Sequence, residues 1–151
     1  VLLGDAVKGI IAVLFGNMLG KAFGLDLAVM AGIFAIAGHN WSAFARFKGG
    51  KGIATSLGVV IGLTPLTVLI LIPVWVGFFV FTRYVSLASI IAVATYPVAV
   101  FFLYAGDISK LTFAVLLAIL AIYRHKDNIV RLHRGEESRI SFQKRKDADE
   151  K

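Results

Sequence analysis

The chain has 151 residues, of which 58% are hydrophobic, and its mean hydropathy is +0.83. A soluble domain of this length cannot bury so much apolar side-chain surface, so the composition excludes a soluble globular protein and indicates an integral membrane protein. The sequence contains no cysteine, which excludes disulfide scaffolds, thiolate metal sites and cysteine nucleophiles.

Six apolar runs follow one another along the chain, at residues 9–20, 27–38, 53–63, 65–82, 84–105 and 111–123. They are continuous and lack period-two alternation, which favours helices over outer-membrane strands. Only the runs 65–82 and 84–105 approach the roughly 20 residues that cross a bilayer, and the run 53–63 is short enough to be partial or re-entrant. We therefore predict an all-α integral membrane protein, a polytopic bundle of about six membrane helices with one short or re-entrant.

The formal net charge is +7, and the positive charge is distributed unevenly. If the six runs cross the membrane in turn, all but two of the 16 basic residues lie on one side, and only Lys21 and Lys110 lie on the other. Lys and Arg favour cytoplasmic loops, so this bias places both chain ends in the cytoplasm and accounts for the charge without nucleic-acid binding. We expect one membrane-embedded domain over residues 1–132 and a charged cytoplasmic tail over residues 133–151.

A glycine-rich, cationic segment at residues 47–55 separates the second and third runs. Within it, Gly49, Gly50, Lys51 and Gly52 can direct several backbone N–H groups and one ammonium group at a single phosphate. The segment lacks the Walker spacing, and a flexible turn carrying topogenic lysines would have a similar composition. On the residues alone, phosphate binding and a plain cytoplasmic turn both remain open.

A second polar cluster follows the last apolar run. His125, Asn128 and Arg131 are three residues apart, so a helical continuation of that run places them on one face. A neutral amide and a titratable imidazole among cations suit the recognition of hydroxyl and phosphate groups, although a solvated basic helix end would give the same pattern. His39, at the end of the second run, more often makes a structural hydrogen bond than binds a ligand.

Residues 38–55, which include the run Phe-Lys-Gly-Gly-Lys-Gly-Ile-Ala-Thr, closely resemble the second motif of the PlsY family, the acyl-phosphate:glycerol-3-phosphate acyltransferases. Residues 125–136 resemble that family's third motif, and residues 5–9, Asp-Ala-Val-Lys-Gly, resemble the entry to its second membrane helix. Residues 83–89 are also similar to a stretch of the family. The resemblance covers nearly the whole chain in order.

This sequence departs from the family pattern in two places. The family has seven membrane helices, and its first helix and the following Gly-Ser-x-Asn-x-Gly-Ala-Thr-Asn motif have no counterpart in this sequence, so we expect an N-terminally truncated copy. The proline usual in the second motif is replaced around Ser42 and Ala43, where we expect a local backbone change at most.

The resemblance implies transfer of a fatty acyl group from acyl phosphate to the 1-hydroxyl of glycerol 3-phosphate, which yields lysophosphatidic acid and phosphate at the cytoplasmic face of the bacterial inner membrane. An acyl phosphate is already activated, so this chemistry needs positioning and anion stabilisation rather than a cofactor or a metal. The expected partners are the two substrates and membrane lipid, with no nucleic acid. The expected site residues are His125, Asn128 and Lys51 for catalysis, Gly49, Gly50, Gly52, Lys48 and Arg131 for substrate phosphate, and His39 and Thr55 as supports.

The alternatives are a transporter or channel for an anionic metabolite or lipid, and a noncatalytic membrane scaffold. A transporter requires polar groups at mid-membrane depth, but the runs carry only Asn17 and scattered Ser and Thr, and no inverted repeat is evident. A scaffold explains the charge and the apolar runs but not the presence of both polar clusters. The enzyme is therefore the preferred hypothesis.

Overall fold

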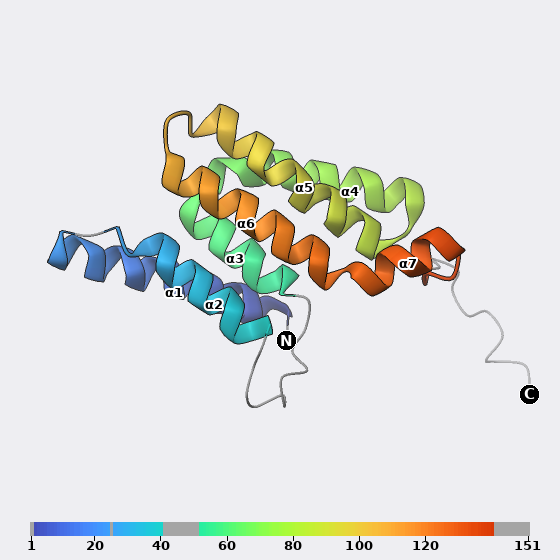
Figure 1. Cartoon of the computed structure of the whole chain (residues 1–151), viewed down its shortest axis with the longest axis horizontal. Coiled ribbons are helices and arrows are strands. Elements are labelled where there is room, and N and C mark those ends of the chain that lie inside the picture. The colour runs from blue at the N-terminus through green and yellow to red at the C-terminus, as the bar shows by residue number, and fades with distance from the viewer. Residues whose placement is uncertain (1, 25, 41–51, 141–151) are drawn as a thin grey trace, which may run out of the picture.

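The computed structural model describes residues 2–24, 26–40 and 52–140, and within them every regular element is a helix (Figure 1). The helices are α1 (Leu2–Phe23), α2 (Ala28–Asn40), α3 (Ile53–Leu63), the short 3-10 turn η2 (Pro65–Thr67), α4 (Val68–Thr82), α5 (Val85–Leu103), α6 (Ile108–Arg124) and α7 (Lys126–Arg134). The predicted all-α membrane fold is confirmed.

The number of membrane-length helices differs from the prediction. In the described residues, three segments are long and apolar enough to cross a bilayer, namely α1, η2 with α4, and α5; α6 and α7 together form a fourth candidate, bent by 55°. In the described part of the chain, two separate apolar helices rather than one are too short to cross a bilayer, because α2 has 13 residues and α3 has 11. The N-terminal run is longer than expected, since Asp5 lies in the first turn of α1, where the helix dipole favours an acidic side chain.

The first six helices form two groups, α1 to α3 and α4 to α6, which meet where α6 packs against α2 and α3 (Figure 1). Connections such as Thr64 between α3 and η2, or Arg83–Tyr84 between α4 and α5, are only one or two residues long, so neighbouring helices run in opposite directions. This alternation brings the start of α1, α3 and α5 to the same end of the bundle as the end of α2, α4 and α6. The second polar cluster borders this end, as does Gly52, the first described residue of the glycine-rich segment.

Helices α1 and α3 pack backbone to backbone. A Cβ atom at Gly58 would collide with the carbonyl group of Ala6, and one at Gly62 would lie 2.8 Å from Cβ of Val13. Small residues permit this approach, which allows van der Waals packing to hold helices together where lipid supplies no hydrophobic driving force. The short helix α3 is thereby fixed against the long helix α1.

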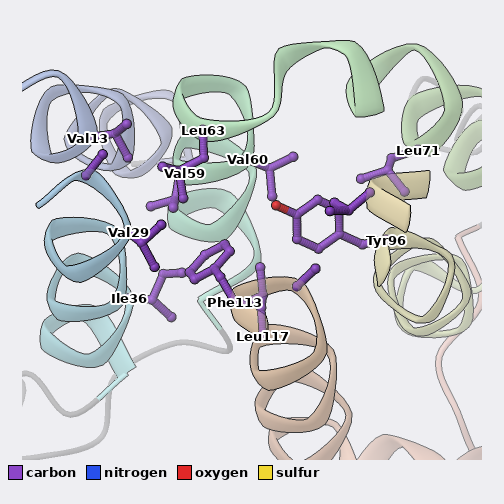
Figure 2. Packing of buried hydrophobic residues seen from close by; sticks show 13 residues of the cluster. Val13, Val29, Ile36, Val59, Val60, Leu63, Leu71, Tyr96, Phe113 and Leu117 are labelled. Atoms are coloured by element: carbon purple, nitrogen blue, oxygen red, sulfur yellow. The ribbon is translucent and has the colours of Figure 1, made fainter. Parts of the chain in front are cut away.

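The buried core lies between the two groups (Figure 2). Val13 and Val59 are fully buried at the α1–α3 contact, and the rings of Tyr96 and Phe113 meet edge to face with centroids 6.4 Å apart. The Tyr96 hydroxyl lies 2.9 Å from Oγ1 of Thr64, so the one polar atom of this ring is satisfied.

Candidate active site

A cavity of about 970 Å³ lies between α3, α4 and α5 and opens at the end of the bundle where α3 and α5 begin. Its polar lining residues lie near that end and are His39, Gly52, Ser56, Ser86, Ser89, His125, Asn128, Glu137 and Ser138. Its apolar lining residues continue along the helices and include Ile53, Leu57, Val60, Leu71, Ile72, Trp75, Val93 and Leu117. One cavity therefore combines a polar mouth with an apolar interior.

The Glu137 carboxylate organises the mouth of the cavity. Its Oε1 accepts hydrogen bonds from Ser86 Oγ at 2.7 Å and from Asn128 Nδ2 at 2.6 Å, and its Oε2 accepts one from Arg131 Nε at 2.7 Å. The side chain of Glu137 is 8% exposed, whereas that of Arg131 is 44% exposed. A single acid thus connects the start of α5 to two successive turns of α7.

Glu137 reaches this position because the chain reverses direction after α7. Gly135 takes the left-handed conformation with φ 72°, which ends the helix and directs the following residues back over α5. The returning segment, residues 135–140, is fixed there by Arg139, whose Nε donates to the Tyr84 hydroxyl at 2.7 Å and whose guanidinium lies 4.8 Å from the ring centroid. The predicted boundary at residues 132 and 133 stays a prediction, but residues beyond it contribute to this site.

The hydrogen bonds lower the pKa of Glu137 to about 2. Burial alone would raise this pKa, but donation from Ser86, Asn128 and Arg131, together with the charge of Arg131, outweighs it. Glu137 is therefore a fixed anion at neutral pH. It acts as an acceptor for its neighbours, and a group with so low a pKa is a poor proton acceptor for catalysis.

His125 lies at the junction of α6 and α7, where the 55° bend places its side chain at the cavity. The residue is 2% exposed, and its Nδ1 lies 2.7 Å from the carbonyl oxygen of Ala121. A carbonyl oxygen only accepts, so Nδ1 carries the hydrogen, and in the neutral ring Nε2 holds the lone pair. The backbone of α6 thereby selects the tautomer that can receive a proton at Nε2.

The three predicted residues of the second cluster have different environments. His125 and Asn128 are buried, and both line the cavity. Arg131 is half-exposed, does not line the cavity, and joins the site through Glu137. The predicted helical continuation of α6 is interrupted by the 55° bend at His125, so this residue lies at the junction and not on one helical face with Asn128 and Arg131. Arg131 contacts an acid that sequence reasoning missed.

The described end of the glycine-rich segment is Gly52, which lines the cavity. Its φ of 72° is left-handed, and a Cβ atom there would lie 2.7 Å from Oδ1 of Asn40, so both backbone conformation and space require glycine. Thr55, one turn into α3, is buried, and among the described residues neither its hydroxyl nor Asn40 Oδ1 has a hydrogen-bond partner. The other predicted members of this cluster, Lys48, Gly49, Gly50 and Lys51, lie outside the described residues.

His39 lies beside the start of α1, where its Nδ1 is 3.7 Å from Oδ1 of Asp5. The same carboxylate oxygen accepts from Lys8 Nζ at 3.2 Å. His39 also lines the cavity, so it joins α1 to the polar mouth from the end of α2. This geometry is compatible with the supporting role that was expected for it.

Ser86 and Glu137 are the site residues that the sequence interpretation missed. Ser86 lies in a stretch that resembles the family, but no other candidate site residue stands beside it in the sequence. Glu137 lies in a tail of mixed charge that was given no role in the site. One signal was available for Glu137, since Gly135 two residues earlier is typical of a helix end followed by a reversal. In the described residues, no three His, Cys, Asp or Glu side chains are grouped so that they could hold a metal ion.

Comparison with known proteins gives the family. The family model described as glycerol-3-phosphate acyltransferase matches residues 1–135. The chain is 49% identical over 143 residues to a protein of that name from Desulforudis audaxviator, covering 95% of this chain and 70% of the relative. It is 41% identical over 146 residues to one from Laribacter hongkongensis, covering 95% and 72%.

Two crystal structures of PlsY, an integral membrane glycerol 3-phosphate acyltransferase, share the fold. The lysophosphatidic acid form superposes with a TM-score of 0.80 at 40% identity, covering 91% of this chain and 69% of that one. The glycerol 3-phosphate form gives a TM-score of 0.81 at 39% identity, covering 92% and 71%. The chain is therefore a multi-pass membrane protein that belongs to the glycerol-3-phosphate acyltransferase family, as the resemblance of its motifs to PlsY indicated.

Proposed function

We propose that this chain transfers the acyl group of an acyl phosphate to the 1-hydroxyl of glycerol 3-phosphate, producing lysophosphatidic acid and inorganic phosphate. The observation that carries the proposal is a cavity that combines a polar mouth with an apolar interior. An acyl phosphate has the same two parts, a dianionic head and a hydrocarbon chain. Its head would lie beside Ser86, His125 and Asn128, and its chain would lie between α3, α4 and α5.

In the proposed step, the 1-hydroxyl oxygen of glycerol 3-phosphate attacks the acyl carbon, and the bond from that carbon to the phosphate oxygen breaks. The hydroxyl proton goes either to Nε2 of His125 or to a phosphate oxygen of the substrate. His125 suits the first route because its Nδ1 already donates to Ala121, which leaves the lone pair on Nε2 of the neutral ring. The acyl phosphate is activated, so the step requires no nucleophile from the protein.

Asn128 would orient the acceptor. Its Nδ2 donates to Glu137, and this hydrogen bond fixes the amide so that Oδ1 is the atom that can accept from a glycerol hydroxyl group. Arg131 would act through the same carboxylate, which it holds at 2.7 Å, rather than by direct contact with substrate phosphate. This role differs from the phosphate contact expected from the motif.

The glycine-rich segment would bind phosphate through Lys51, Lys48 and the backbone of Gly49, Gly50 and Gly52. Its support is indirect: Gly52, its first described residue, and His39, which precedes it on α2, both line the polar mouth of the cavity. Thr55 has a buried hydroxyl without a partner among the described residues, which makes it a candidate to brace this segment.

We place the site at the cytoplasmic face of a bacterial inner membrane, with residues 1–132 as the membrane domain and residues 133–151 as the cytoplasmic tail. The support is the distribution of basic residues. Among the described residues, the end of the bundle with the polar mouth carries Lys8, Arg83, Arg124, Lys126, Arg131, Arg134 and Arg139. Lys21 and Lys110 line a separate cavity of about 510 Å³ at the other end. The surrounding lipid would hold the acyl chain of the substrate before it enters the cavity.

The test is the formation of lysophosphatidic acid by the purified chain in lipid, supplied with acyl phosphate with and without glycerol 3-phosphate. We expect product only with both substrates, and at least a 100-fold loss in Lys51→Ala, because one charge-stabilising contact is worth about this much. Lys21→Ala, at the opposite end, is the matched control and should retain activity. Anion uptake into liposomes without any acyl transfer would overturn the proposal and support the transporter.

A further inference from the structure

The face of α5 that lines the cavity carries its largest side chain at the end farthest from the mouth. Val85, Ser86, Ser89, Ala92 and Val93 line the cavity from the start of α5 onward, and Tyr96 is the last α5 residue that lines it. The side chains before Tyr96 are all smaller than its ring. The hollow along α5 therefore ends at Tyr96.

Tyr96 is held rigidly in this position. It is 1% exposed, its hydroxyl is 2.9 Å from Thr64 Oγ1, and its ring meets Phe113 edge to face (Figure 2). Thr64 is itself fixed, since its hydroxyl also donates to the carbonyl oxygen of Val60 at 3.2 Å and lies 3.3 Å from Oγ1 of Thr67. Rotation of the tyrosine would leave a buried hydroxyl unpaired, which opposes movement of the ring.

The other walls of the cavity end at a similar depth. The lining residues farthest from the polar mouth are Val60 on α3, Leu71 on α4 and Leu117 on α6. Ten residues separate Ser86 from Tyr96, a rise of about 15 Å along an α-helix. An extended hydrocarbon chain advances about 1.25 Å per tetrahedral carbon, so about twelve carbons span this depth.

The cavity also opens sideways. Ile72 on α4 lines it and is nevertheless 46% exposed, which places part of the wall at the lipid-facing surface. A chain that meets Tyr96 can therefore leave the bundle past α4 rather than stop. Tyr96 marks the depth at which that turn is forced.

We propose that Tyr96 is the end wall of the acyl-chain site, which the chain meets about twelve carbons from its carbonyl group before it turns out into the bilayer. This inference rests on the proposed function and adds to it which part of the acyl chain the protein contacts and selects by length. Acyl chains too short to reach Tyr96 leave part of the cavity unfilled and lose packing contacts. Acyl chains that extend past Tyr96 differ from one another only in the part that lies in lipid.

The first test moves the wall by one turn. Ala92→Leu fills the cavity about 5.4 Å nearer the mouth, which corresponds to about four carbons. In wild type, kcat/KM per mole fraction of acyl phosphate in the lipid should rise with chain length up to about twelve carbons and stay level to eighteen. In Ala92→Leu the break should move to about eight carbons, with the ratio of twelve-carbon to eight-carbon activity reduced at least tenfold.

Ala94→Leu is the matched control, because Ala94 is exposed and does not line the cavity. It should keep the break of wild type. An unchanged break in Ala92→Leu, or an equal shift in Ala94→Leu, would overturn the role of Tyr96. Absence of acyl transfer with every chain length in wild type would instead count against the proposed function.

The second test does not depend on turnover. Trp75 lines the cavity on α4, seven residues before the end of that helix, at a depth of about 10 Å. In a Trp41→Phe background, which leaves Trp75 as the single tryptophan, alkyl phosphates brominated at one carbon should quench its fluorescence most strongly near the eighth carbon. Quenching that does not depend on the brominated position would refute an ordered chain in this cavity.

Discussion

Replacement of Glu137 by Gln tests the organisation of the cavity mouth. The substitution removes the negative charge and presents an amide NH₂ group to one of the three donors, so at least one buried hydrogen bond is lost. The pKa of Glu137 falls from an ordinary 4.5 to about 2 in the folded protein. At 1.36 kcal/mol for each unit, this shift corresponds to about 3 kcal/mol at neutral pH as an upper limit.

Solvent reduces that limit, because the Arg131 side chain that supplies the charge is 44% exposed. We therefore expect Glu137→Gln to lower the free energy of unfolding by about 1–2 kcal/mol at pH 7, which lowers Tm by about 2–8 °C in a chain of this size. A carboxylate with a lowered pKa stabilises the fold above pH 4.5, and this contribution disappears as the pH falls toward 2. The difference in Tm between wild type and the variant should shrink accordingly.

The assay is thermal unfolding in detergent at a series of pH values from 7 to 3. Glu136→Gln is the matched control, because the neighbouring carboxylate is exposed, and its Tm should follow wild type throughout. A difference between wild type and Glu137→Gln that is equal at pH 7 and pH 3 would refute the electrostatic reasoning. So would a Glu136→Gln variant with the same loss.

Two further substitutions test the packing on which the site rests. Gly58→Ala should lower the free energy of unfolding by about 1–3 kcal/mol, seen as a lower Tm, because the added Cβ collides with the backbone of Ala6. Gly77→Ala is the control, since its Cβ would enter open space and should not lower Tm. Equal Tm values for the two variants would contradict the close α1–α3 contact. Tyr96→Phe should lower the free energy of unfolding by about 1 kcal/mol, because the Thr64 hydroxyl loses one of its buried hydrogen-bond partners. The dependence of activity on acyl-chain length should stay unchanged. A shifted dependence would show that the hydroxyl rather than the ring forms the wall.

The continuous apolar runs were sufficient to predict an all-helical membrane protein. Their boundaries were less informative: the run 9–20 lies within a helix that begins at Leu2, because Asp5 and Lys8 form an ion pair one turn apart instead of ending the helix. The length of α2 could not be predicted from hydropathy, since Gly38, His39 and Asn40 continue the helix after its apolar part.

The candidate site was predictable where its residues lie close together in the sequence and not where they come from distant segments. His125 and Asn128 were predicted together from their spacing and both line the cavity, although the 55° bend at His125 breaks the helix that the prediction assumed. The Ser86–Glu137 hydrogen bond joins residues 51 apart, and it depends on a chain reversal after α7 that a pattern of helical periodicity does not contain. The choice of tautomer at His125 likewise depends on the carbonyl of Ala121, whose position is set by the end of α6.

The docking of residues 135–140 onto α5 has a practical consequence for anyone attaching a reporter to this protein. Besides the contacts of Glu137 and Arg139, the backbone N–H of Ile140 donates to the carbonyl oxygen of Arg83 at 3.1 Å. A fluorescent protein joined directly after Arg134 would remove the acid that holds Ser86 and Asn128, although it would leave every apolar helix intact. A fusion that reaches the membrane in normal amounts can therefore still be inactive, and the junction belongs beyond residue 140.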